Sequence, residues 1–321
     1  MKRAERPPVR VAIPIAMREA LQRRLPSGIE VSWFDDTESA IRAAADSEVL
    51  WIGFPGSGRS EDIERALGAG PRLRWLTTPA AGVDGMPLDA IAKRGLTLTN
   101  GAGLHAVPIA EFVVMAMLAA AKDFPEFVRA QDRSEWLNQP HSLGELQGSR
   151  ALVVGMGGIG QAIAERLRAF GVEVTGVRRS SAEGLLGPDQ WRPRLPDFDW
   201  VIMAAPLTGG TTHVIGESEL RAMKPTAWLV NIARGGLVDQ AMLVRALREG
   251  WIGGAYLDAT APEPLPSESP LWTMPNVIIS PHSSAASTRL TERMAELFLD
   301  NLDRFLSERP LRNTVDLRAG Y

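Results

Sequence analysis

The chain has 321 residues. That is more than the roughly 100 to 200 residues of a typical domain, so we expect two domains. With 45% hydrophobic and 23% charged residues, it has the composition of an ordinary globular protein. A net charge of -3, with both signs spread along the chain, argues against a protein that mainly binds nucleic acid. The absence of cysteine excludes disulfides, thiolate catalysis and thiolate metal sites.

The start of the chain does not have the pattern of a secretory signal, because Arg10 and Pro14 interrupt its apolar run. The most apolar stretch, residues 109–121, contains Glu111 and is shorter than the roughly 20 residues of a membrane span. We therefore expect a buried helix in this stretch, no association with a membrane, and a cytoplasmic location.

Short runs rich in Val, Ile and Leu alternate with helical patterns through the first hundred residues. The runs predict strands at residues 9–15, 29–34, 49–53, 73–78 and 96–99. Amphipathic stretches such as TESAIRAAA and SEDIERAL lie between them. This alternation is typical of an α/β fold, in which helices cover a parallel sheet.

The pattern changes to helical over residues 105–137, and a second series of strands and helices begins at residue 151. A last helical pattern covers residues 285–307. The two series predict two parallel-sheet α/β domains.

The second series opens with three spaced glycines: Gly155, Gly157 and Gly160 form G-x-G-x-x-G directly after an apolar strand and at the start of an amphipathic helix. In that context the first glycine permits a tight turn, the second lets the backbone approach a pyrophosphate, and the third lets helix and strand pack closely. The helix N-terminus then binds the phosphates. The stretch therefore predicts a Rossmann-like domain that binds a dinucleotide.

The next strand ends at Arg178 and Arg179, followed by Ser180. In this fold an acidic residue at that position binds the adenosine ribose of NAD, whereas an arginine accommodates the 2′-phosphate of NADP. Glu173 lies near the start of the strand and is too far from the ribose. A guanidinium binds a phosphate dianion that a carboxylate would repel. We expect NADP(H) to be preferred, with NAD(H) possible; the alternative is that the arginines only flank a surface loop.

Three later strands each lead to a charged residue: Arg234, Glu263 and His282. Ligands of an open parallel sheet lie beyond the carboxyl ends of its strands. Reduction of a carbonyl by NAD(P)H needs a proton donor, and histidine suits that task near neutral pH. A carboxylate partner favours the imidazolium form, and an arginine binds a substrate carboxylate. Each residue alone is more often structural, but together they indicate a ketoacid reductase.

The sequence resembles the D-isomer-specific 2-hydroxyacid dehydrogenase family over nearly its whole length. The resemblance is carried by PAAGVDGMPLDAIAKRGLTLTN, AEFVVMAML, the glycine motif, APLTGGTTHVIGESELRAMKPTAWLVNIARGGLVD, LDATAPEPLP and SPHSS. It implies that Arg234, Glu263 and His282 are the catalytic group. It also implies that Asp258 contacts the nicotinamide amide, and that Ala81 and Gly82 hold the substrate carboxylate through backbone N–H groups. After His282 this family often has a small residue and a glycine, where this chain has SSA.

The resemblance also implies a layout of two doubly wound parallel-sheet domains, Rossmann-like or flavodoxin-like, with a cleft between them. Residues 1–100 and 285–321 would form a substrate-binding domain, and residues 101–284 a dinucleotide-binding domain. The cleft would close over nicotinamide and substrate by a hinge motion. The apolar helix at 109–121 and the segment after it would form the interface of a homodimer.

We therefore expect NADPH-dependent reduction of a small 2-ketoacid, such as glyoxylate or hydroxypyruvate, to the D-2-hydroxy acid, with His282 as proton donor. Phe54 is a further candidate for the substrate pocket. No pair of histidines has metal-ligand spacing, so we expect no metal site. The alternatives are an NAD-linked phosphoglycerate or formate dehydrogenase, or a dinucleotide-sensing binding protein similar to a corepressor. The expected cofactor contacts are Gly155, Gly157, Gly158, Ile159, Gly160, Arg178, Arg179, Ser180, Pro206, Thr208, Ala233 and Asp258.

Overall fold

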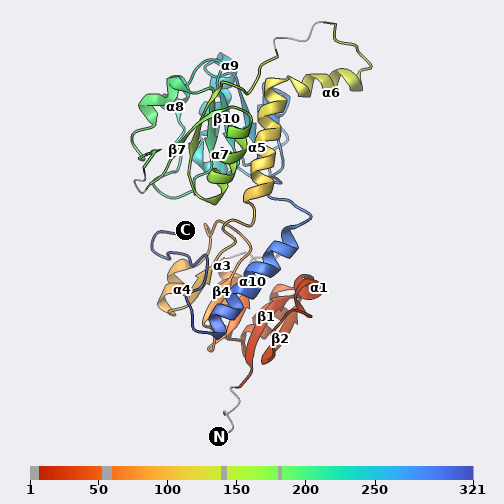
Figure 1. Cartoon of the computed structure of the whole chain (residues 1–321), viewed down its shortest axis with the longest axis vertical. Helices are drawn as coiled ribbons and strands as arrows, with labels where there is room; N and C mark the ends of the chain where they lie inside the picture. Colours follow the sequence, from red (N-terminus) through yellow and green to blue (C-terminus); the bar gives the residue numbers. More distant parts are fainter. Residues whose placement is uncertain (1–6, 53–59, 139–142, 180–182, 321) are drawn as a thin grey trace. The chain divides into compact units, whose positions relative to one another are not determined.

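The computed structural model describes residues 7–52, 60–138, 143–179 and 183–320. The chain divides into two compact units. Unit 1 comprises residues 1–104 and 287–321, and unit 2 comprises residues 105–286. Both units are built on parallel sheets with helices, as expected from the sequence (Figure 1).

Unit 1 contains a five-stranded parallel sheet in the order β2-β1-β3-β4-β5. This is the flavodoxin-like strand order. The chain places β2 on one side of β1 and then adds β3, β4 and β5 on the other side, so the strand order reverses between β1 and β3. The strands are β1 (Val9–Pro14), β2 (Ile29–Phe34), β3 (Val49–Trp51), β4 (Trp75–Thr77) and β5 (Thr97–Thr99). The α-helices are α1 (Arg18–Leu21), α2 (Thr37–Ala44), α3 (Ser60–Ala69), α4 (Leu88–Lys93) and α10 (Leu290–Leu306).

Helix α10 returns from the C-terminal part of the chain to pack on the sheet of unit 1 (Figure 1). The ring of Phe298 stacks on Trp75, with the ring centres 5.5 Å apart. The Trp75 indole N–H donates to the hydroxyl of Thr99 at 2.8 Å, so the polar atom of this buried side chain has a partner. The final helical segment therefore belongs to the hydrophobic core of unit 1.

Unit 2 contains a seven-stranded parallel sheet in the order β12-β11-β10-β9-β6-β7-β8. Its strands are β6 (Arg150–Val154), β7 (Glu173–Val177), β8 (Leu185–Leu186), β9 (Trp200–Met203), β10 (Trp228–Asn231), β11 (Gly254–Leu257) and β12 (Val277–Ile279). The α-helices are α5 (Ala106–Ala121), α6 (Phe124–Asp132), α7 (Gly158–Ala169), α8 (Glu217–Ala222) and α9 (Gln240–Glu249). The strand order reverses between β6 and β9, which is where a doubly wound sheet binds its ligands.

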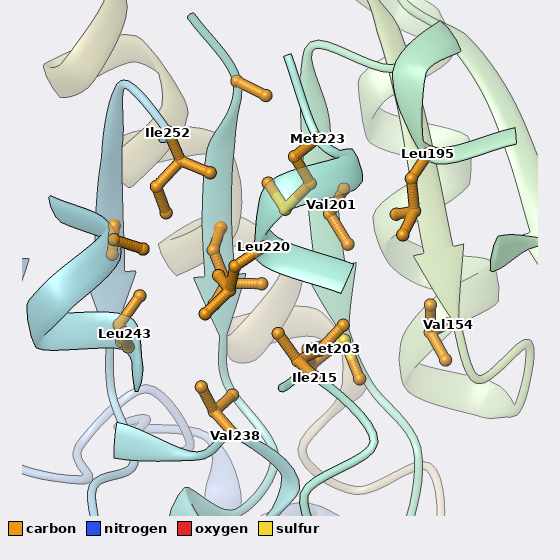
Figure 2. Packing of buried hydrophobic residues seen from close by; sticks show 14 of the residues in the cluster. Val154, Leu195, Val201, Met203, Ile215, Leu220, Met223, Val238, Leu243 and Ile252 are labelled. Carbon is orange, nitrogen blue, oxygen red and sulfur yellow. The ribbon is translucent and has the colours of Figure 1, made fainter. Parts of the chain in front are cut away.

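Two apolar layers cover the two faces of this sheet. On one face, α8 and α9 contribute Leu220 and Leu243 to a cluster that also contains Val201 and Met203 of β9 (Figure 2). On the other face, α5 packs beside α7 through an apolar cluster (Figure 1). Because both faces are covered, the strands are apolar on both sides rather than alternating.

The helical pattern over residues 105–137 forms two helices, α5 and α6. Helix α5 ends at Ala121, and Asp123 has the left-handed backbone angle φ 49° before α6 begins. Pro125 lies in the first turn of α6, where its missing N–H costs little. Inside a continuous helix the same proline would remove a backbone hydrogen bond, which explains why α5 ends and a new helix, α6, begins here. Among the described residues, the helices are too short or too polar to cross a membrane.

Candidate active site

The glycine motif has the three geometries that dinucleotide binding requires. A Cβ on Gly155, where φ is +110°, would lie 2.5 Å from the carbonyl carbon of Ala204. A Cβ on Gly160 would lie 2.1 Å from the oxygen of Gly155, so α7 can approach the turn only because this residue is glycine. A Cβ on Gly157 would meet no atom within 4 Å. This glycine therefore faces open space, and its backbone leaves room for the close approach of a pyrophosphate.

The first turn of α7 is suited to an anion. Gly157 is its N-cap and provides no side-chain cap, and no acidic residue lies in the first turn. The first N–H groups of a helix, here those of Gly158, Ile159 and Gly160, have no acceptor within the helix. Together with the positive end of the helix dipole, such N–H groups suit a phosphate. The residues of this turn thus fit the pyrophosphate of a dinucleotide.

The two arginines lie at the expected strand end. Strand β7 ends at Val177, and the side chains of Arg178 and Arg179 are exposed. The backbone N–H of Arg178 donates to the carbonyl of Leu186 at 3.0 Å, which fixes the chain just beyond β7. Glu173 is the first residue of β7, at the opposite end of the strand from the arginines. Ser180 lies outside the described residues.

The loop after β9 is held by its own side chains. The hydroxyl of Thr211 donates to the carbonyl of Pro206 at 2.7 Å. The same hydroxyl oxygen accepts the N–H of Thr208 at 2.8 Å. These bonds hold Pro206 and Thr208, two of the predicted cofactor contacts, in a fixed loop at the strand-order reversal.

Asn231, the buried last residue of β10, shapes the loop that carries Arg234. Its side-chain amide donates to the carbonyl of Arg234 at 2.9 Å, and its side-chain oxygen accepts the N–H of Ala233 at 3.2 Å. A guanidinium nitrogen of Arg234 donates to the carbonyl of Ala233 at 2.9 Å. A Cβ on Gly235 would lie 2.0 Å from the carbonyl of Thr260, so the loops after β10 and β11 are in direct contact.

Glu263 and His282 form a pair across the loops that follow β11 and β12. Nδ1 of His282 lies 2.8 Å from Oε2 of Glu263, and the two side chains are 42% and 39% exposed. Because a carboxylate only accepts, Nδ1 carries the hydrogen in this bond and Nε2 is left for another partner. The second oxygen of Glu263 accepts the N–H of Thr260 at 2.9 Å. The carboxylate is thereby oriented by its own loop.

Asp258, the first residue after β11, is enclosed by the turn that contains His282. Its side chain is only 2% exposed. One oxygen accepts the hydroxyl of Ser280 at 2.5 Å and the backbone N–H groups of Ser283 and Ser284 at 2.9 and 3.1 Å. The other oxygen accepts the N–H of Ser284 at 3.2 Å and also the Ser284 hydroxyl. The backbone N–H of His282 donates to the Asp258 carbonyl at 2.9 Å.

Tyr256 extends this group of hydrogen bonds into the sheet. Its hydroxyl lies 2.7 Å from the hydroxyl of Ser280. Since Ser280 donates its only hydrogen to the carboxylate of Asp258, Tyr256 must be the donor to Ser280. Burial, together with the nearby charge of Asp258, raises the pKa of Tyr256 to about 12, although its bond to Ser280 acts in the opposite direction. Tyr256 therefore stays a donor at ordinary pH.

The remaining predicted residues lie in unit 1. Ala81 and Gly82 belong to the loop after β4 and are half-buried. The side-chain amide of Asn100 donates to the carbonyl of Ala81 at 2.7 Å, which anchors that loop. Phe54 lies outside the described residues.

Sequence reasoning missed four residues that build the site: Asn231, Tyr256, Ser280 and Ser284. A polar residue at the end of an otherwise apolar strand was a usable signal for Asn231. The only signal for Ser284 was the departure from the family pattern after His282. Which atoms the serines contact depends on the path of the turn, and the sequence does not reveal it.

Known proteins resemble the chain in both sequence and structure. Residues 114–284 match the sequence profile described as D-isomer specific 2-hydroxyacid dehydrogenase, NAD binding domain. A glyoxylate reductase of Korarchaeum cryptofilum is 39% identical over 246 residues, which are 74% of each chain.

Two solved structures show the same fold. A D-isomer specific 2-hydroxyacid dehydrogenase family protein from Aeromonas salmonicida is 29% identical, with a TM-score of 0.84 over 97% of this chain and 100% of that chain. An NADPH-dependent glyoxylate/hydroxypyruvate reductase from Sinorhizobium meliloti, solved with NADP and malonate, is 27% identical, with a TM-score of 0.78 over 97% of this chain and 98% of that chain. From the glycine turn, the charged strand ends and these similarities, we conclude that the chain belongs to the D-isomer specific 2-hydroxyacid dehydrogenase family.

Proposed function

We propose that the protein reduces a small 2-ketoacid to the D-2-hydroxy acid with NADPH, glyoxylate and hydroxypyruvate being the first candidates. The chain is an NAD(P)-dependent oxidoreductase by its family. The observation that carries the proposal is the 2.8 Å pair of His282 and Glu263 at the carboxyl end of the sheet that bears the glycine turn. The names of the similar enzymes from Korarchaeum and Sinorhizobium support the substrate class.

His282 acts as the proton donor in this proposal. The nicotinamide, when bound, supplies the hydride that adds to the carbonyl carbon of the ketoacid. The carbonyl oxygen then needs a proton, and the imidazolium provides it from Nε2 because Nδ1 is held by Glu263. Glu263 fixes the ring through Nδ1, so Nε2 presents its proton at a defined position.

Arg234 is the proposed partner of the substrate carboxylate. The hydrogen bonds of Asn231 to the backbone at Ala233 and Arg234 fix the chain from which the guanidinium extends. A planar guanidinium binds a carboxylate through two parallel hydrogen bonds, which also sets the direction of the carbonyl. Ala81 and Gly82 of unit 1 are proposed to bind the same carboxylate with backbone N–H groups.

The preference for NADPH rests on the exposed arginines after β7. Arg178 follows the strand end at which an acidic residue would bind the ribose of NAD. A guanidinium at that point favours the 2′-phosphate of NADP by charge and by geometry. The Sinorhizobium enzyme, whose structure was solved with NADP, supports this preference.

The test is an assay of NADPH oxidation with glyoxylate, hydroxypyruvate, pyruvate and phenylpyruvate, each compared with an uncharged analogue that lacks the acid group. We expect turnover of at least one ketoacid and little of its analogue. Since glycolate is achiral, the glycerate formed from hydroxypyruvate is the product whose D configuration is checked by chiral chromatography. Equal turnover of an acid and its uncharged analogue would refute the carboxylate clamp.

We also propose a homodimer that uses the apolar groove between α5, α6 and α7. The groove encloses about 560 Å³ and is lined by Glu111, Val114, Met115, Leu118, Ala119, Lys122, Phe124, Arg166 and Phe170. Met115 and Phe124 are 50% and 55% exposed, which is unusual for large apolar side chains clustered in one place. Sedimentation of the protein and of Met115→Glu tests this interface. A monomeric protein would contradict it.

The cytoplasmic location stays a prediction.

A further inference from the structure

The turn after β12 departs from regular backbone geometry at the residue proposed as the acid. His282 has φ +50°, a left-handed conformation that residues other than glycine adopt at a cost. Such a conformation persists where the surrounding structure holds it. Here the backbone N–H groups of His282, Ser283 and Ser284 all donate to Asp258, to its carbonyl or its carboxylate. Asp258 therefore holds the turn that presents His282.

The two oxygens of Asp258 are almost fully used within the chain. A carboxylate offers about four acceptor positions. Four donors of Ser280, Ser283 and Ser284 reach the two oxygens: two hydroxyl groups and two backbone N–H groups, of which the N–H of Ser284 contacts both oxygens. At 2% exposure, the residue is also almost wholly enclosed by the chain. The resemblance assigns Asp258 to the nicotinamide amide, but in this chain its carboxylate is engaged by the turn itself.

We propose that Ser284 and Ser280 are positioning residues, whose hydroxyl groups bind the Asp258 carboxylate and so fix the turn that aims His282. This deepens the proposed function and rests on His282 being its proton donor. Ser284 is buried with its hydroxyl on one oxygen of Asp258, and Ser280 binds the other oxygen while accepting from Tyr256. The backbone donors alone would leave part of a buried charge without partners, which is costly.

The first test does not depend on the reaction. Hydrogen exchange of the backbone amides of residues 282–284 is measured in the full-length protein and in Ser284→Ala. We expect exchange at least about tenfold faster in the variant, because losing one charge-assisted hydrogen bond weakens the turn by that order. Ser283→Ala is the matched control, since Ser283 binds Asp258 through its backbone nitrogen, which the substitution keeps. Equal exchange in both variants would overturn the proposal.

The second test separates positioning from cofactor binding. For Ser284→Ala we expect the ketoacid kcat to fall about tenfold further than it does in the control Ser283→Ala. The solvent deuterium isotope effect on kcat should also rise, because proton transfer becomes slower. The Kd for NADPH should stay within about twofold. If NADPH binding instead weakens as much as kcat falls, Asp258 serves the nicotinamide and the proposal is wrong.

Ser280 provides an independent pair of variants if Ser284→Ala does not fold. Ser280→Ala removes the donor to Asp258 and the acceptor of Tyr256, whereas Ser280→Thr keeps a hydroxyl group. We expect faster exchange and lower kcat in the alanine variant, and recovery of both in the threonine variant. Absence of ketoacid turnover in the unaltered protein would refute the proposed function, whereas the exchange measurements would still decide whether the serines hold the turn.

Discussion

Oε2 of Glu263 lies 2.8 Å from Nδ1 of His282, although the two residues follow different strands. The carboxylate keeps this position because its other oxygen accepts the N–H of Thr260 at 2.9 Å. The pair joins the loops after β11 and β12 at the end of the sheet where ligands of this fold bind. A fixed carboxylate that orients an exposed imidazole makes that imidazole suitable for general acid catalysis.

Glu263→Gln keeps the shape of the side chain and removes its charge. We expect the ketoacid kcat/KM to fall by at least about tenfold, because a neutral amide holds the imidazole less firmly than the carboxylate that now lies 2.8 Å from Nδ1. Glu268→Gln, an exposed carboxylate of the same loop, is the control. An unchanged kcat/KM in a folded Glu263→Gln variant would mean that Glu263 is not the functional partner of His282.

Arg178→Asp should reverse the cofactor preference. The unaltered protein is expected to favour NADPH over NADH by at least about tenfold in kcat/KM, which corresponds to roughly 1.4 kcal/mol. An aspartate repels the 2′-phosphate and can accept hydrogen bonds from the ribose of NAD. Arg168→Asp is the control, because it makes the same change of charge at an exposed position near the end of α7, away from the end of β7. Equal use of both cofactors by the unaltered protein would disprove the role of the arginine.

Two alanine variants of the glycine turn should fail in different ways. In Gly160→Ala the new Cβ would lie 2.1 Å from the oxygen of Gly155, so we expect a loss of at least about 2 kcal/mol in the free energy of unfolding. In Gly157→Ala the Cβ meets no atom within 4 Å, so the fold should be kept while the methyl group occupies the space of the pyrophosphate. Thermal unfolding and NADPH titration distinguish the two. Unchanged NADPH affinity in Gly157→Ala would contradict the proposed pyrophosphate site.

Tyr256 should titrate far above an ordinary tyrosine. Burial raises its pKa from 10.0 to about 12, so the folded protein holds this proton over a range in which the unfolded chain has lost it. The resulting stabilisation, of order 2 to 3 kcal/mol, is fully present below pH 10 and is lost as the pH rises through about 12. The chain has two tyrosines, so in Tyr321→Phe the phenolate absorbance reports Tyr256 alone. If the phenolate absorbance of Tyr256 had its titration midpoint near pH 10 in the folded protein, the burial of this side chain would be contradicted.

The sequence predicted those parts of the fold that depend on local pattern. Apolar runs gave β2 at its observed bounds, and the spacing of the glycines placed the turn before α7. The pairing of Glu263 with His282 was also expected, because both follow strands that end at the same edge. The enclosure of Asp258 was not predicted, since it depends on the register of β12 beside β11 and on the left-handed backbone at His282. Those are properties of the folded turn rather than of residue type.

The variant His282→Ala tests the central claim most directly, through ketoacid turnover and NADPH affinity measured on the same folded protein. Removing the imidazole takes away the proton donor, while the glycine turn and Arg178 that are proposed to hold the dinucleotide stay in place. We predict that kcat falls by at least about a hundredfold, as expected for loss of a general acid, while the Kd for NADPH changes by less than about threefold. A variant that keeps most of its turnover would show that His282 is not the proton donor.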